Sequence, residues 1–150
     1  HSDGDDVPLY EPENEIELIM VHQRALNLSK EIYRRGVGKR IAVDVALKLI
    51  DFNYEEFERM TEPEQWEKIN RGFEAAQTKT DRKKVAKAVA EWADANCVAA
   101  HYGHFIDYFC SEDFGLKAGK SVLDNEHREW LNNDYGINFV KLADLPAILS

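Results

Sequence analysis

The stretch that decides the fold is Glu91–Asp113, which reads EWADANCVAAHYGHFIDYFCSED. Its first half has the apolar spacing of a helix, and this pattern runs into Gly103. An apolar run, Phe105–Cys110, follows at once and has the aromatic content of a strand. Acidic residues then end the run at Asp113. Open α/β sheets bind their ligands just outside the carboxyl ends of strands, so Asp113 stands at a typical site position.

A second carboxylate, Asp94, lies on the expected helix. The eight helical steps that follow Asp94 span roughly 12 Å at about 1.5 Å each. The strand that ends at Ser111 spans roughly 20 Å at about 3.3 Å per residue. If the helix packs antiparallel to the strand, Gly103 makes the turn, and both aspartates lie toward the same end of the pair. We therefore predict that Asp94 and Asp113 lie within reach of one cation. Glu91 lies three positions before Asp94, and we expect it to be solvated or paired with Lys87.

Length and charge exclude several classes of protein. The chain has 150 residues, a net charge of −9 and 44% hydrophobic residues, which indicates a globular protein with its own core. The acidic balance argues against indiscriminate nucleic-acid binding, although it leaves room for a local basic track. No apolar run reaches the ~20 residues of a membrane span, so we expect no membrane contact and a cytoplasmic location. Cys97 and Cys110 lie in apolar runs, and we expect both to be buried, reduced thiols.

We divide the chain into an acidic arm, residues 1–14, and a single α/β domain, residues 15–150. The helical part of this domain covers residues 15–102, and the βαβ part covers residues 103–150. Apolar spacing predicts a first helix from Glu15 to Arg35, which the glycines after it would end.

Residues 39–50 fit either a helix or a short strand at 41–43, and we favour the helix. Asn53 is the expected N-cap of a short helix that ends at Met60. Thr61 and Glu64 have the spacing of a capping box and open the next helix, which reaches about Gln77. Three apolar residues form the expected buried stripe of that helix: Trp66, Ile69 and Phe73. Thr80 is the expected cap of the helix Asp81–Tyr102.

The end of the chain predicts a strand–helix–strand unit. Asp124 is the expected N-cap of a helix to Asp134, which Gly136 ends. Ile137–Leu142 has the apolar content of a second strand. A helix between two strands predicts that the strands pair in parallel. The expected fold is therefore α/β, mostly helical, with a small parallel sheet.

Residues 82–150 resemble the second half of a PIN domain. The residues that carry the resemblance are Asp94, Val98-Ala99-Ala100-His101, Ile106-Asp107-Tyr108-Phe109 and Ser111-Glu112-Asp113, in that order. The helix and strand that follow are similar to the last elements of PIN-like bacterial proteins. The resemblance implies a PIN-like nuclease that hydrolyses RNA phosphodiester bonds with Mg²⁺ or Mn²⁺, of the kind found among toxins and RNA-processing enzymes.

The same resemblance implies the roles of individual residues. Asp94 and Asp113 would be the catalytic, metal-binding carboxylates, and Ser111 would support the loop that holds them. From their positions near Asp94 and Asp113, we also expect Ser111, His101 and Lys117 to contact the substrate. Hard divalent cations prefer several carboxylate oxygens, which is why such acids should converge.

The family's first strand ends in an aspartate, and Asp44 is the nearest counterpart here. Either the first strand is missing or the acidic site is incomplete. We therefore keep a second hypothesis, a non-catalytic PIN-like or helical protein-interaction module, with a protein partner or a second copy of the chain as its ligand.

His101 and His104 do not favour zinc, because no Cys/His set completes a tetrahedral site. Two basic clusters, residues 34–40 and 79–87, are either solvated faces or a phosphate track.

Overall fold

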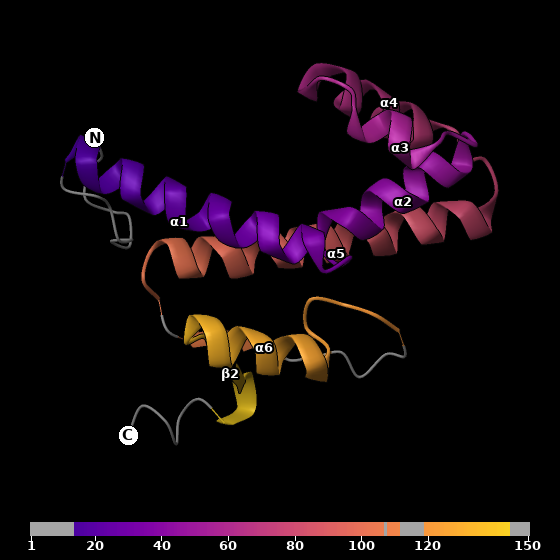
Figure 1. Ribbon diagram of the computed structural model, residues 1–150. Coiled ribbons are helices and arrows are strands. Elements are labelled where there is room, and N and C mark those ends of the chain that lie inside the picture. Colours follow the sequence, from indigo (N-terminus) through magenta and orange to yellow (C-terminus); the bar gives the residue numbers. More distant parts are fainter. Residues whose placement is uncertain (1–13, 107, 112–118, 145–150) are drawn as a thin grey trace, which may run out of the picture.

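The computed structural model describes residues 14–106, 108–111 and 119–144. Its elements, in order, are α1 (Glu15–Arg34), α2 (Lys39–Leu49), α3 (Tyr54–Glu58), α4 (Glu62–Glu74), α5 (Lys79–Gly103), β1 (Tyr108–Ser111), α6 (Asn125–Tyr135), β2 (Asn138–Lys141) and the 3-10 turn η1 (Leu142–Asp144). In Figure 1, α1 lies along α5, α3 and α4 lie beyond α2, and α6 and β2 lie below α5. The expected mixed class, mostly helical with a small parallel sheet, is confirmed.

β1 and β2 pair in parallel, from Tyr108 opposite Asn138 to Ser111 opposite Lys141. The parallel direction was predicted, and α6 is the helix that connects the two strands. The first strand begins later than predicted, because the chain first closes the end of α5. Phe105 has φ 59°, and the N–H of Ile106 donates to the carbonyl of His101 at 2.8 Å. This left-handed residue satisfies a helix-end carbonyl before the backbone extends.

Local side-chain caps start most of the helices. Asn53, Thr61 and Asp124 each accept a hydrogen bond from the backbone N–H three residues later, as predicted. The cap of α5 was predicted wrongly. Thr78, not Thr80, has the extended backbone of an N-cap, and its hydroxyl accepts from the N–H of Asp81 at 3.0 Å. The helix favoured for residues 39–50 is present as α2, which ends at Leu49.

Two clusters of buried apolar residues lie on either side of the molecule. The sheet-side core consists of Leu28, Ile32, Val37, Ala95, Val98, Phe109, Val122, Leu123, Leu131 and Ile137. The helical core consists of Val43, Ala46, Leu47, Phe57 and Ile69. Helix α5 contributes to both, since Ala95 and Val98 belong to the first cluster and Trp92 packs against the second. It is therefore the element against which the other helices are assembled.

Several predictions of burial are wrong. Trp66 is 42% exposed, and Cys97 and Cys110 are both exposed. Side chains alternate along a strand, so Cys110 points away when its neighbour Phe109 enters the core. The apolar stripe of α1 is also only partly buried: Leu28 and Ile32 are covered, whereas Ile16, Ile19, Met20 and Leu26 are exposed.

Of the helices that the structure describes, none has the length and apolar character needed to cross a membrane.

Candidate functional site

The predicted acidic site lies only partly within the described residues. Asp94 is half-buried on α5, and His101 lies seven residues later on the same side of that helix. Ser111 is the last residue of β1, and its partner across the sheet is Lys141. Asp113 and Lys117, the other two predicted site residues, lie outside the described residues. The structure therefore does not test the pairing of Asp94 with Asp113.

His101 has a defined environment. Its Nδ1 lies 2.8 Å from the carbonyl oxygen of Cys97, one turn earlier in α5. Its ring makes an edge contact with Phe109 of β1, with 5.0 Å between the ring centroids. His104 is similarly bonded to the carbonyl of Ala100 at 3.0 Å. Among the residues that the structure describes, no group of three or more His, Cys, Asp or Glu side chains could hold a metal ion.

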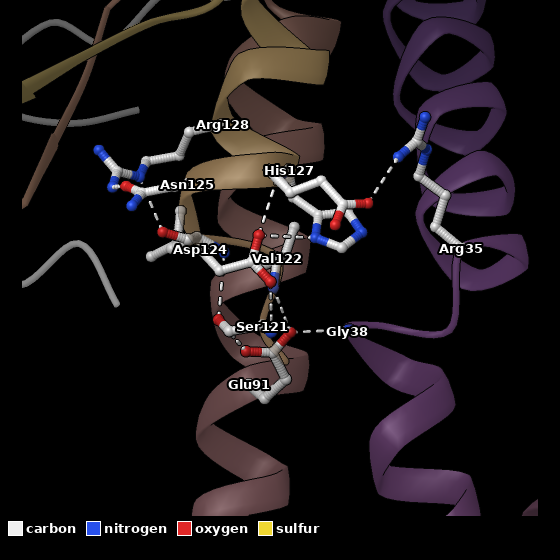
Figure 2. A network of polar contacts seen from close by, with 11 residues as sticks. Arg35, Gly38, Glu91, Ser121, Val122, Asp124, Asn125, His127 and Arg128 are labelled. Atoms are coloured by element: carbon white, nitrogen blue, oxygen red, sulfur yellow. Dashed lines mark hydrogen bonds and ion pairs between the residues drawn. The ribbon is translucent and has the colours of Figure 1, made fainter. Parts of the chain in front are cut away.

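A network of polar contacts is built around Glu91, which was predicted to be solvated or paired with Lys87. That prediction is wrong, because Glu91 is only 8% exposed. Figure 2 shows its carboxylate between three donors. The N–H of Gly38 donates to it at 2.8 Å, the N–H of Val122 at 2.7 Å and the hydroxyl of Ser121 at 2.7 Å. Glu91 thus joins the turn between α1 and α2 to the segment before α6.

The network of polar contacts continues to the start of α6. The Asp124 carboxylate accepts from the N–H groups of Ser121 and His127, at 3.1 and 2.8 Å, and lies 2.8 Å from Nδ1 of the buried His127. Burial alone would raise the pKa of Asp124. The hydrogen bonds from His127 and Ser121 together outweigh it and hold that pKa below its ordinary value.

These residue types could suggest a hydrolase triad, but the geometry gives them a structural role. Ser121 donates its hydroxyl proton to Glu91 and accepts from the N–H of Leu123 at 3.1 Å, so the oxygen is held on both sides. A nucleophilic serine needs a base that takes its proton and that a third group orients. The His127 ring instead contacts Asp124. We conclude that the network fixes the positions of α2, α5 and α6.

A separate feature, which we call the groove, lies on the helical side of the molecule. It is a cavity of about 450 Å³, within the size range of ligand-binding pockets. Its walls come from α1, α2, α3, α4 and α5. The lining residues are Leu26, Ser29, Lys30, Ile32, Tyr33, Arg34, Lys39, Tyr54, Phe57, Glu58, Gln65, Trp92, Ala95 and Asn96. These residues include no His, Cys or Asp.

Aromatic side chains organise the groove. The hydroxyls of Tyr33 and Tyr54 are 2.9 Å apart. Burial, with the bond to Tyr54, raises the pKa of Tyr33 far above its ordinary value, so this phenol stays neutral. Trp92 stacks on Trp66 with 5.4 Å between the ring centroids. Nζ of Lys39 lies 5.5 Å from the Trp66 centroid and 5.6 Å from that of Trp92, a cation–π arrangement.

The groove and the predicted acidic site lie on different sides of α5. Trp92 and Asn96 line the groove and are four residues apart, so they share one side of the helix. Asp94 lies two residues after Trp92, about 200° around the helix axis. The two candidate sites are therefore independent surfaces.

Sequence reasoning missed both Glu91 and the groove. For Glu91 a signal exists: Ala88, Ala95 and Val98 share its side of α5, and an acid in an apolar stripe indicates a buried carboxylate with partners. For the groove no local signal exists, because its residues come from five helices.

No family model, curated protein or solved structure matches this chain.

Proposed function

We propose that this protein is a helical protein-interaction module, which binds a short segment of a partner protein in the groove. The observation that carries this proposal is the composition of the groove. Its lining combines the buried side chains of Ile32, Phe57 and Ala95 with less buried polar residues such as Ser29 and Asn96. An apolar pocket with a polar rim is the usual form of a site that receives one large side chain of a partner.

The groove residues do not favour catalysis. Of the titratable groups that line it, Tyr33 is kept neutral by burial, and its hydroxyl is bonded to Tyr54. Glu58 is the one carboxylate among the lining residues, and it is exposed. Among the lining residues that the structure describes, there is no histidine or cysteine to act as a base or a nucleophile. Binding without chemistry is therefore the function that this surface supports.

A displayed library of random twelve-residue peptides tests the proposal. The library is selected on the full chain and on the Leu26→Glu variant. Leu26 is 49% exposed and lines the groove, so the substitution blocks the groove without disturbing a core. We expect selected peptides to bind the variant about tenfold more weakly, because a charged side chain opposes an apolar contact.

The matched control is Leu18→Glu. Leu18 is 44% exposed on the same helix and is not among the groove residues. Peptides should bind this variant as they bind the unaltered chain. Equal weakening by Leu18→Glu and Leu26→Glu, or selection of no peptide at all, would count against the groove as a binding site.

A PIN-like, metal-dependent ribonuclease is the second candidate, and one observation favours it. The strands β1 and β2 are parallel, and His101 of α5 packs against Phe109 of β1. Asp94 is on the same side of α5 as His101. This arrangement supports a carboxylate site near the end of β1, which would need Asp113 and further oxygen ligands to hold Mg²⁺ or Mn²⁺.

Two substitutions test the nuclease candidate. If it holds, Asp94→Asn and Asp113→Asn should each abolish cleavage of RNA in the presence of Mn²⁺, since an amide keeps the size of the side chain and removes its charge. Glu129→Gln, an exposed acid on α6, is the control and should cleave normally. Cleavage that survives both aspartate changes, or unaltered protein that cleaves no RNA, would leave the interaction module as the better account.

A further inference from the structure

The charges around the groove indicate what kind of segment binds there. Of the described residues that line it, Lys30, Arg34 and Lys39 are cationic and Glu58 is the one carboxylate. This surplus of cations stands out in a chain whose net charge is −9. Arg34 forms an ion pair with Glu31. Among the described residues, no carboxylate forms an ion pair with Lys30 or Lys39, and Lys30 is exposed.

Exposed apolar residues of α1 form a strip on the side of Leu26, which lines the groove. Ile19 lies seven residues earlier on the same side of the helix, and Ile16 lies one turn before Ile19. Ile19 is 65% exposed and Ile16 is 72% exposed. An apolar strip beside a positively charged groove is complementary to a chain segment with spaced apolar residues and acidic neighbours.

We propose that the groove takes an acidic segment of a partner protein. Its apolar side chains would lie along Ile16, Ile19 and Leu26, and its carboxylates would face Lys30 and Lys39. This inference rests on the function proposed above and specifies the chemistry of the ligand. The charged contacts lie at the edge of the site, so binding weakens as salt is added.

The experiment compares two displayed libraries of twelve-residue peptides with the same apolar positions. The remaining positions carry Asp and Glu in one library, and Asn and Gln in the other. Both are selected on the full chain. We expect enrichment of the acidic library alone. Equal enrichment of the neutral library would overturn the acidic inference and leave the interaction module standing, whereas enrichment of neither library would overturn both.

A charge variant then locates the contact. With an enriched acidic peptide, the change Lys30→Gln with Lys39→Gln should weaken binding roughly fivefold, because two charge pairs at the edge of a site are lost. The control is Lys83→Gln with Lys87→Gln, two exposed charges on the opposite side of α5 from Trp92. Equal weakening by both pairs of changes would overturn the assignment to the groove. Thermal unfolding monitored by circular dichroism checks that both variants are folded.

Two further measurements separate other occupants from a partner protein. Displacement of the acidic peptide by an equimolar single-stranded oligouridylate would overturn the proposal in favour of RNA. The first residues of this chain also carry Asp3, Asp5 and Asp6. If changing these three residues to Asn in the full chain tightens peptide binding tenfold or more, the chain's own start is the occupant, and the proposal falls. Unchanged affinity in both measurements supports it.

Discussion

At the scale of single residues, Glu91 is a buried carboxylate on α5. Its carboxylate accepts hydrogen bonds from Gly38, Ser121 and Val122, which belong to two segments far apart in the sequence. Gly38 has φ 65°, and a Cβ there would lie 2.6 Å from Cβ of Ala95. A glycine is therefore needed at the point where the turn approaches α5. One acid thus positions the turn on one side of α5 and the start of α6 on the other.

Replacing Glu91 by Ala should destabilise the protein by about 3 kcal/mol, because two buried N–H groups lose their acceptor. Urea unfolding, followed by circular dichroism, measures the change. Glu129→Ala is the control, since Glu129 is an exposed acid on α6 and should change stability by less than about 0.5 kcal/mol. A loss at Glu91 no larger than that of the control would show that the network does not stabilise the fold.

Asp124 makes the stability of the protein depend on pH. Its hydrogen bonds lower its folded-state pKa, so its contribution is present above the ordinary carboxyl pKa and is lost as the pH falls through the lowered value. Asn caps a helix about as well as Asp. We therefore expect Asp124→Asn to cost about 1 kcal/mol at pH 7 and progressively less toward pH 3. Urea unfolding of both proteins across this pH range checks the trend. A difference in the free energy of unfolding that stays constant with pH would contradict it.

At the scale of elements, the helical side depends on one close approach between α2 and α4. A Cβ at Gly72 of α4 would lie 2.3 Å from the carbonyl oxygen of Ala46 in α2. The two backbones can therefore meet only if residue 72 has no side chain. The start of α4, by contrast, is a local structure: Thr61 and Glu64 form a complete capping box, with Pro63 in the first turn.

Gly72→Ala should destabilise the protein by about 2 kcal/mol, although Ala is the better helix former. The clash with α2 costs about 1–3 kcal/mol, whereas the gain in helix propensity is at most about 1 kcal/mol. Thermal unfolding provides the measurement, with Arg71→Ala at the exposed neighbouring position as the control. A Gly72→Ala protein as stable as the unaltered chain would show that α2 and α4 lie farther apart than described.

At the scale of the whole molecule, α5 is common to both cores, and Figure 1 shows it between α1 and α6. Ala95 and Val98 serve the sheet-side core, and Trp92 packs against the helical core. Unfolding of either core removes packing from the same helix. The two cores should therefore unfold together.

We predict one unfolding transition in urea, with coincident midpoints from circular dichroism and tryptophan fluorescence. Trp92 and Trp66 report on the helical side, and Trp130 packs against the sheet-side core. Phe57→Ala, in the helical core, should lower both midpoints equally and cost about 3–5 kcal/mol. If the unfolding midpoints from fluorescence and circular dichroism differ in this variant, the two cores unfold as independent units.

The sequence alone determined the features that depend on neighbours a few residues away. The caps at Asn53, Thr61 and Asp124 were predictable, because each hydrogen bond spans three residues. The end of α6 at Gly136 was predictable as well, since a left-handed residue at that place favours glycine. The parallel pairing of β1 and β2 also followed from local order, because a helix separates the strands.

Only the tertiary structure decided which surfaces of those elements are covered. Glu91 looked like a solvated acid until Gly38 and Val122, from distant parts of the chain, came within hydrogen-bond distance of it. The groove exists because five helices meet, and no spacing in the sequence encodes that meeting. Hydrogen bonds across three residues are set by local geometry, whereas burial depends on the packing of the whole chain.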